Sequence, residues 1–357
     1  MHIKELLRQM IEKDGSDLFY RVGGKPYIRV DGKVLVAGDS VLTPAEVAGT
    51  VEELTTPAQR EKLKATLDID FTVYFQELGR RFRVSIFMQR NHYAMVIRNV
   101  RPFVQSFDEL NLPGETLKKL CLESRGLVLL TGSAGSGKST TIASMVDYIN
   151  SNLEKHVLTV EEPIEYTFED KRSVINQREI GLDVVSYPTA LRAFTLQSPD
   201  VIFIGNIRDS ETMFSALTAA ETGVLVLSTL HTVNASQTVE RIINFFPPHQ
   251  HNEIKTQLSF ILKGVISLRL VPRQDCGGRI PAYESMLLTP TIARLIREGK
   301  LWEMPRFIEE GSLFGMQSFT QSLLKLIKEG KISEEAAEEF SDNKEEFRLA
   351  CRGIRKT

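Results

Sequence analysis

The sequence predicts an α/β protein of two domains, in which a parallel sheet flanked by helices carries a phosphate-binding loop. With 357 residues, the chain exceeds the size of one ordinary domain. From about residue 116 onward, apolar strand-length segments alternate with helical ones, as in a parallel sheet with helices packed on it. The glycine-rich stretch GSAGSGKS lies between the first of these strands and the first of these helices.

The composition is that of a soluble globular protein, with 42% hydrophobic and 25% charged residues. A net charge of −2 gives no basic excess for nucleic acid or an anionic membrane. The three cysteines, Cys121, Cys276 and Cys351, form no CxxC pair, which suits a reducing cytosol and excludes a four-cysteine zinc site. There is no signal-peptide core and no apolar run near the roughly 18 residues of a membrane span, so we expect membrane association only through a partner.

Residues 1–100 read as a small α+β domain. Ile3, Leu6, Leu7, Met10 and Ile11 have the spacing of an amphipathic helix. A hairpin is predicted at Asp31-Gly32, between strands over Tyr27–Val30 and Lys33–Val36. The other predicted elements are a helix over Pro44–Leu54 and strands over Ile69–Phe75, Arg81–Met88 and Tyr93–Val100.

A linker is predicted over residues 101–115, where Pro102, Pro113 and Gly114 fall. The second domain then covers residues 116–357, with a helical end from about residue 291. Its acidic stretch Glu334–Glu346 is most simply a solvated helix face. Its predicted strands are Leu127–Thr131, Val157–Val160, Val201–Ile204, Val224–Thr229 and Val265–Leu270.

The strand Leu127–Thr131 runs directly into the pattern G-x-x-x-x-G-K-S, and Thr140–Asn150 then reads as a helix. Glycines let backbone N–H groups turn toward phosphate oxygens, and the helix N-terminus adds partial positive charge. Lys138 is expected to reach the β- and γ-phosphates, and Ser139 to offer its hydroxyl to Mg²⁺. The predicted nucleotide-binding residues here are Gly132, Ser133, Ala134, Gly135, Ser136, Gly137, Lys138, Ser139 and Thr140.

Three other strands also end in polar residues. They lead into Glu161-Glu162, into Asn206 with Arg208 and Asp209, and into His231. In an open parallel sheet, ligands bind at the carboxyl ends of the strands, so these side chains could converge on the phosphates.

Ordinary structural roles compete with these assignments. The paired glutamates could be surface charge, and His231 could be a structural histidine. Arg208 and Asp209 could pair with each other or cap the next helix.

Four segments in this order resemble the secretion-type ATPases: Gly132–Ser139, Thr159–Glu165, Ser198–Asp209 and Ser228–Thr232. The chain is similar in particular to the type IV pilus retraction ATPases, the PilT/PilU group, over nearly its whole length. Members of this group lack the zinc-binding tetracysteine insert of many extension ATPases, in agreement with the missing CxxC pairs.

The resemblance implies a PAS-like N-terminal domain joined to a RecA-like P-loop ATPase core. It further implies a homohexameric ring that binds ATP and Mg²⁺ and drives pilus disassembly through an inner-membrane platform protein. The location would be cytoplasmic and peripheral to the inner membrane, with no direct insertion and no nucleic-acid partner. A paralogous retraction ATPase is a further expected partner. Glu161 matches the family's strand-end glutamate, a catalytic and metal-binding position, and His231 matches its histidine box.

Arginines of the N-terminal domain gain a role from the same resemblance. In Arg81–Met88, alternate apolar residues share one face and leave Arg81 and Arg83 on the other, while Arg98 ends the next strand. Taken alone, these arginines would be solvated edge charges. The resemblance implies that Arg83 and Arg98 contact the nucleotide phosphates, with Arg81 a weaker candidate.

The sequence departs from the family at three positions. Glu162 stands where the family has Asp, Leu196 where it usually has Arg, and Asn206 where it has Glu. Because an amide cannot accept a proton from water, we expect ATP binding with weakened hydrolysis, unless Glu161 compensates.

Two other functions remain open at this point. One is a non-hydrolysing ATP-binding paralogue that regulates or scaffolds an active retraction ATPase. The other is a RecA-like motor on nucleic acid, against which the near-neutral charge argues.

Overall fold

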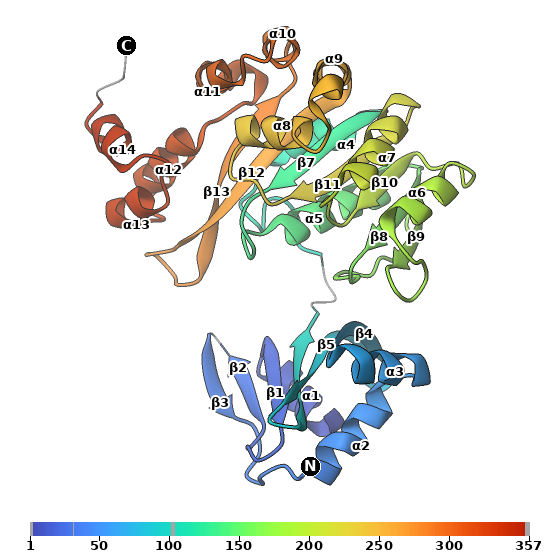
Figure 1. The fold of residues 1–357 in the computed structure, drawn as a ribbon. Helices are drawn as coiled ribbons and strands as arrows, with labels where there is room; N and C mark the ends of the chain where they lie inside the picture. Colours follow the sequence, from blue (N-terminus) through green and yellow to red (C-terminus); the bar gives the residue numbers. More distant parts are fainter. Residues whose placement is uncertain (1–2, 31, 101–103, 354–357) are drawn as a thin grey trace. The chain divides into compact units, whose positions relative to one another are not determined.

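The computed structural model describes residues 3–30, 32–100 and 104–353 of the chain. The chain divides into two compact units (Figure 1). The first comprises residues 1–103 and 163–167, and the second comprises residues 104–162 and 168–357.

The first unit is built on an antiparallel six-stranded sheet in the order β3-β2-β1-β6-β5-β4. Its helices pack on one face of this sheet, where Leu6, Val51 and Val84 belong to a single buried cluster. The strands are β1 Asp17–Arg21, β2 Tyr27–Val30, β3 Lys33–Val36, β4 Asp68–Phe75, β5 Arg80–Gln89 and β6 His92–Asn99; the helices are α1 Ile3–Glu12, α2 Pro44–Leu54 and α3 Pro57–Thr66.

The structure confirms the predicted first helix, the helix over Pro44–Leu54 and the predicted strands of this unit to within a residue or two. β2 and β3 pair as a hairpin with Val30 opposite Lys33, while Asp31 itself lies outside the described residues. Helix α3 was not predicted. Its N-terminus nonetheless repeats the capping box of α2, in which a Thr-Pro pair is followed by a glutamate or glutamine, here Gln59.

Strand β3 forms one edge of this sheet and pairs only with β2 in the described part of the chain. All four of its residues are exposed. Val34, Leu35 and Val36 keep 45–50% of their surface accessible, so this edge presents apolar side chains.

The second unit contains a seven-stranded sheet in the order β13-β12-β7-β11-β10-β8-β9. All neighbouring pairs are parallel except β12 and β13, which form an antiparallel hairpin. The strands are β7 Gly126–Thr131, β8 His156–Glu161, β9 Val174–Glu179, β10 Val201–Ile204, β11 Leu225–Leu230, β12 Leu262–Pro272 and β13 Arg279–Leu287. The central strands β7, β10 and β11 are buried throughout, as expected for a sheet covered on both faces.

Helices cover both faces of this sheet (Figure 1). One face is covered by α4 Gly114–Cys121 and α5 Lys138–Asn152. The opposite face is covered by α6 Tyr187–Phe194, α7 Ser210–Glu221, α8 Ala235–Ile243, α9 His251–Ile261, α10 Pro290–Glu298 and α11 Met304–Glu310.

The last three helices pack on hairpin β12–β13, and we call them the C-terminal cluster. They are α12 Phe319–Lys328, α13 Glu334–Glu339 and α14 Lys344–Cys351. Ala337 and Phe347 are buried in it, while Glu334 and Glu345 are exposed. The acidic stretch is therefore a solvated helix face, as predicted.

The structure differs from the sequence-based prediction in two elements of this unit. β9 was not predicted because its sequence, VINQRE, is polar and it lies at the sheet edge. β13 was not predicted either, although it pairs with β12 over nine residue positions.

Most of the predicted linker, residues 101–115, belongs to the second unit in the structure. Residues 101–103 fall outside the described residues. From residue 104 on, the chain belongs to the second unit, and Phe107 and Leu112 are buried in its core.

Candidate nucleotide-binding site

Four polar segments meet at the carboxyl edge of the second unit's sheet because neighbouring strands end in register. Leu230 of β11 is opposite Thr131 of β7, and Ile204 of β10 is opposite both Ser228 and Val160. At about 4.8 Å between strands, His231 is one strand from the phosphate loop, Asn206 two and Glu161 three.

The phosphate loop is shaped by glycines with positive φ. The φ angles of Gly132, Gly135 and Gly137 are 140°, 74° and 99°, and Gly137 is the N-cap of α5. A Cβ atom at Gly132 would lie 2.5 Å from both the Leu268 carbonyl oxygen and Ser136 Oγ. Only glycine fits at this point of the loop.

Gly132→Ala is expected to destabilise the protein by about 3 kcal/mol or more, since the backbone strain adds to a clash with the β12 backbone. Gly135→Ala is the matched control, because a Cβ there would meet nothing within 4 Å. Its cost is expected to be about 1 kcal/mol, from backbone strain alone. Denaturant unfolding of the two variants measures the difference, and equal losses would contradict the steric argument.

Lys138 is 8% exposed and lies within the loop. Its ammonium Nζ donates to the carbonyl oxygens of Gly132 at 2.7 Å and Ser133 at 2.8 Å. The Nδ1 atom of His231 is 3.4 Å from the same Nζ. Burial and the nearby positive charges of Lys138 and Arg208 lower the pKa of His231, so its ring is neutral at pH 7 and Nδ1 can accept from the ammonium.

Asn206 follows β10 and is 9% exposed. Its side-chain oxygen Oδ1 is buried and has no hydrogen-bond partner among the residues that the structure describes. A Cβ at the preceding Gly205 would lie 3.2 Å from both Glu161 Cα and Tyr187 Oη, so the strand end is tightly packed. A buried acceptor of this kind is suited to bind a water or a ligand donor.

Tyr187, the first residue of α6, was not singled out from the sequence. It makes a hydrogen bond with the Asn206 backbone, and burial, followed by the charge of Glu162, raises its pKa far above the ordinary value. No spacing rule pointed to it, because only the packing of α6 over the strand ends brings it to Asn206.

Glu161 ends β8 and is 5% exposed. Its Oε1 atom accepts from Thr159 Oγ1 at 2.7 Å and from Gln177 Nε2 at 3.2 Å. Both donors hold the carboxylate in place at the end of the strand.

Glu162, in contrast, is half-exposed and lies 3.5 Å from Arg208 Nη1. Asp209 caps α7 by accepting from the Thr212 backbone N–H at 2.8 Å. Of the two ordinary roles proposed for Arg208 and Asp209, the helix cap is therefore correct for Asp209, while Arg208 is paired with Glu162.

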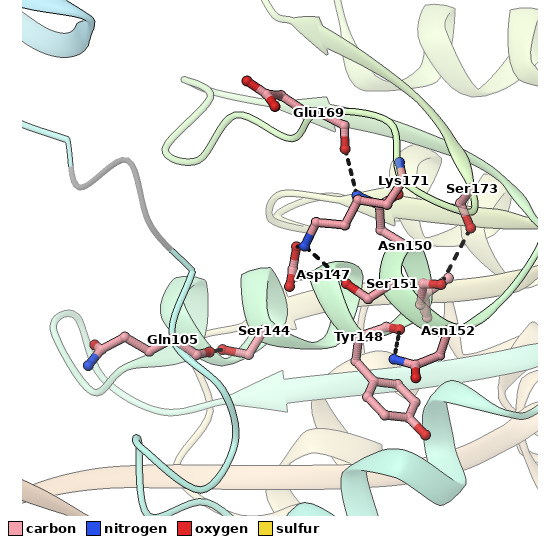
Figure 2. A network of polar contacts seen from close by, with 11 residues as sticks. Gln105, Ser144, Asp147, Tyr148, Asn150, Ser151, Asn152, Glu169, Lys171 and Ser173 are labelled. Carbon is pink, nitrogen blue, oxygen red and sulfur yellow. Dashed lines mark hydrogen bonds and ion pairs between the residues drawn. The ribbon is translucent and has the colours of Figure 1, made fainter.

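The segment that leads into β9, and thus to Gln177, is attached to the C-terminal end of α5 (Figure 2). Asn150 is fully buried, and its side chain donates to the Glu169 carbonyl at 2.8 Å and accepts from the Lys171 N–H at 3.0 Å. Lys171 Nζ also reaches Asp147 at 2.7 Å. These contacts fix the start of β9 beside β8.

Asn150→Ala is expected to cost about 2–3 kcal/mol of stability, because a fully buried side chain is lost and the Glu169 carbonyl and Lys171 N–H would both lose their partner. The control is Asn152→Ala, which removes an exposed contact with the Tyr148 carbonyl of the same helix and is expected to cost about 0.5 kcal/mol. Chemical denaturation checks both values. Similar losses in the two variants would mean that the buried network contributes little.

The arginines of the first unit lie side by side on its sheet, since Arg83 of β5 and Arg98 of β6 are direct cross-strand neighbours. Each is paired with an aspartate: Arg83 Nε is 3.1 Å from Asp70 Oδ1, and Arg98 Nε is 3.0 Å from Asp17 Oδ1. They are thus ion-paired on the sheet rather than isolated edge charges.

Arg81 and Leu196 are the remaining positions that the sequence analysis singled out. Arg81 lies 3.5 Å from Thr72 Oγ1. Leu196 is 88% exposed just after α6.

A parallel sheet with a strand–glycine loop–helix unit at its carboxyl edge defines a P-loop nucleotide-binding protein. Residues 2–323 match the family of type II/IV secretion system proteins, and the chain belongs to this family. The α/β P-loop fold predicted from the sequence is confirmed.

The chain is 41% identical to the type IV pilus ATPase PilU of Pseudomonas aeruginosa, over 98% of this chain and 91% of that protein. It is 40% identical to the type IV pilus retraction ATPase PilT of the same organism, over 97% of this chain and 100% of that protein. The crystal structure of the pilus retraction motor PilT with bound ADP has a TM-score of 0.89 and 42% identity, with 97% of this chain and 98% of that chain covered. No helix in the described residues has the length and apolar character of a membrane span.

Proposed function

We propose that this protein is an ATP-driven motor of type IV pilus retraction whose own hydrolysis is weak. The relatives named above are pilus ATPases, one of which is crystallised with ADP. The observation that carries the proposal of weak hydrolysis is Asn206, whose buried Oδ1 has no partner among the described residues. It lies at the strand end where the resemblance to the retraction ATPases implies a glutamate.

The loop fits a nucleotide triphosphate. Positive-φ glycines turn its backbone, Lys138 supplies a buried ammonium, and Ser136 Oγ is buried without a hydrogen-bond partner in the described residues. Gly132–Thr140 would hold the phosphates, and Ser139 with Glu161 would hold Mg²⁺. The metal would neutralise charge on the β- and γ-phosphate oxygens.

Asn206 can orient a water molecule through Oδ1 but cannot take its proton. Glu161 is the candidate base in place of Asn206, yet it lies one strand farther from the phosphate loop than Asn206. Its Oε1 is also engaged by Thr159 and Gln177. In this proposal Glu161 therefore makes up only in part for the missing general base at Asn206. Glu162 and His231 are the further catalytic polar groups near the phosphates.

The first unit, residues 1–100, would contribute Arg83 and Arg98 to the phosphates, and residues 116–357 would form the ATPase domain. The observation behind this assignment is the pair of adjacent guanidinium groups on one sheet, each a planar donor suited to phosphate oxygens. On nucleotide binding, Arg83 and Arg98 would each replace the ion pair with an aspartate by one with a phosphate.

The double substitution Arg83→Ala with Arg98→Ala is expected to lower nucleotide-dependent activity about 10-fold or more, because two charge-assisted contacts are lost. Arg29→Ala is the matched control, since Arg29 lies 3.4 Å from Asp17 on the same sheet but has no assigned contact with nucleotide. ATP hydrolysis and ADP-analogue affinity are the measurements. If the double variant behaves like the Arg29 variant, the arginines do not reach the phosphates.

As such a motor, the protein would form a homohexamer in the cytoplasm. The hexamer would lie at the inner membrane, bound to the platform protein of the pilus machinery. The second candidate function is a non-hydrolysing ATP-binding paralogue of an active retraction ATPase, and Asn206 favours it as well.

Phosphate release with Mg²⁺ and ATP, measured beside ATP binding on the same preparation, separates the two candidates. Slow but Lys138-dependent turnover supports the weak motor. Binding without turnover supports the regulatory paralogue. Absence of ATP binding would overturn both.

A further inference from the structure

Glu284 is a buried carboxylate of the second unit that lies outside the phosphate loop and the strand ends beside it. It lies in β13 and is 6% exposed. Its Oε1 atom accepts from the backbone N–H of Ala235, the first residue of α8, at 2.7 Å. The first N–H groups of a helix have no partner within the helix and carry partial positive charge, so a carboxylate is a favourable partner there.

The first turn of α8 is directly connected to His231. Only residues 232–234 lie between His231 and the start of α8 at Ala235. Two of these three residues make side-chain hydrogen bonds with the first turn of α8. Asn234 accepts from the Gln237 N–H at 2.9 Å, and the hydroxyls of Thr232 and Thr238 are 2.7 Å apart. Since His231 lies 3.4 Å from Lys138 Nζ, the position of α8 sets the position of the histidine at the phosphate loop.

Charged groups from two other elements act on Glu284. Burial raises its pKa to about 7, and the hydrogen bond from Ala235 opposes this rise. Asp342, between α13 and α14, raises the pKa further, and Arg269 of β12 lowers it.

Arg269 connects β12 to the C-terminal cluster. It donates to the Phe340 carbonyl at 2.6 Å, pairs with Asp342 and lies 3.7 Å from the centre of the Phe319 ring. Its strand neighbours Leu268 and Leu270 border the phosphate loop at Gly132 and Gly137.

We propose that Glu284 is a positioning residue of the nucleotide site, which holds the first turn of α8 and thereby fixes His231 against Lys138. The C-terminal cluster acts on the same contact through the charges of Arg269 and Asp342. The effect of this arrangement on nucleotide binding rests on the proposed function. The contact between Glu284 and the Ala235 N–H is independent of that function.

The test is hydrogen exchange, followed by mass spectrometry, of the full nucleotide-free chain in a peptide covering residues 231–238. Glu284→Ala is expected to raise exchange in this peptide about 10-fold, because the Ala235 N–H loses its acceptor. Glu284→Gln keeps an acceptor oxygen and is expected to stay within about twofold of the wild type at pH 7.

Ser285→Ala is the matched control. Ser285 is the next residue of the same strand, is 1% exposed, and donates to the Gly315 carbonyl at 3.0 Å, away from α8. Its loss should leave exchange in residues 231–238 unchanged. Equal exchange in Glu284→Ala and the wild type, or an equal rise in Ser285→Ala, would overturn the proposal.

A pH series keeps the proposal testable if Glu284→Ala does not fold. After correction for intrinsic exchange rates, protection of residues 231–238 in the wild type should rise between pH 6 and pH 8, as the carboxylate ionises and becomes a stronger acceptor. Glu284→Gln should show no such rise. Asp342→Asn should shift the rise to lower pH, because it removes the negative charge that opposes ionisation. A rise that persists in Glu284→Gln would exclude Glu284 as its source.

Affinity for a fluorescent ADP analogue separates this proposal from the proposed function. Affinity about 10-fold weaker in Glu284→Ala and restored in Glu284→Gln supports the positioning role. If the wild type does not bind the analogue, the proposed function fails, while the exchange data still decide whether Glu284 holds α8. Unchanged affinity in Glu284→Ala would show that the contact does not serve the nucleotide site.

Discussion

Replacing Asn206 with glutamate is expected to raise the rate of ATP hydrolysis at saturating ATP by about 10²–10⁴-fold, equivalent to about 3–5 kcal/mol of activation free energy. The amide is buried at a strand end two strands from the phosphate loop, with Oδ1 unpartnered among the described residues. A carboxylate there can accept the proton that the attacking water loses. Steady-state phosphate release with excess Mg²⁺ and ATP measures the change.

Asn206→Gln is the control for length, since it lengthens the side chain as glutamate does but cannot accept the proton. Its turnover should remain near that of the wild type or fall. Asn206→Asp supplies the charge on a shorter arm and should give a smaller gain than glutamate. A wild-type rate already equal to that of Asn206→Glu would show that another group, with Glu161 the first candidate, is the working base.

Replacing Lys138 with alanine is expected to weaken nucleotide binding by about 10²-fold, or roughly 3 kcal/mol, and to reduce any turnover at least as much. In the structure its ammonium is held among the Gly132 and Ser133 carbonyls and His231, at the centre of the glycine loop. Phosphate contacts there would be charge-assisted and largely shielded from water. Titration with a fluorescent ADP analogue gives the affinity.

Lys171→Ala is the matched control for the loss of a lysine next to the same helix. Lys171 pairs with Asp147 near the C-terminal end of α5 (Figure 2). Lys138 is the first residue of the same helix, at its opposite end. Its loss should leave affinity unchanged. Retention of wild-type affinity in Lys138→Ala would remove the phosphate loop from the proposed binding site.

Elements with a strong local pattern could be predicted from the sequence. The apolar runs of β7, β10 and β11 are bounded by glycine or polar residues, and their bounds were predicted closely. Alternating Phe82, Val84 and Ile86 were predicted to share one face, and all three are buried in the structure. In these segments local propensity and burial favour the same structure.

Other features could not be predicted because they depend on residues far apart in the chain. β9 is polar and becomes a strand by pairing with β8, and Tyr187 reaches Asn206 only through the packing of α6. Likewise, nothing local to Arg98 indicates Asp17 as its partner, 81 residues away. Helix α3 is different, since its capping box was visible in the sequence and was missed.

The exposed apolar edge of β3 has a consequence for the behaviour of the protein at high concentration. An outer strand with free backbone groups and valine or leucine side chains is a template on which another extended chain can add. Lys33 is the one charged residue of β3 that could oppose such addition. Solubility during purification should accordingly respond more to substitutions in these four residues, such as Leu35→Lys, than to changes elsewhere on this sheet.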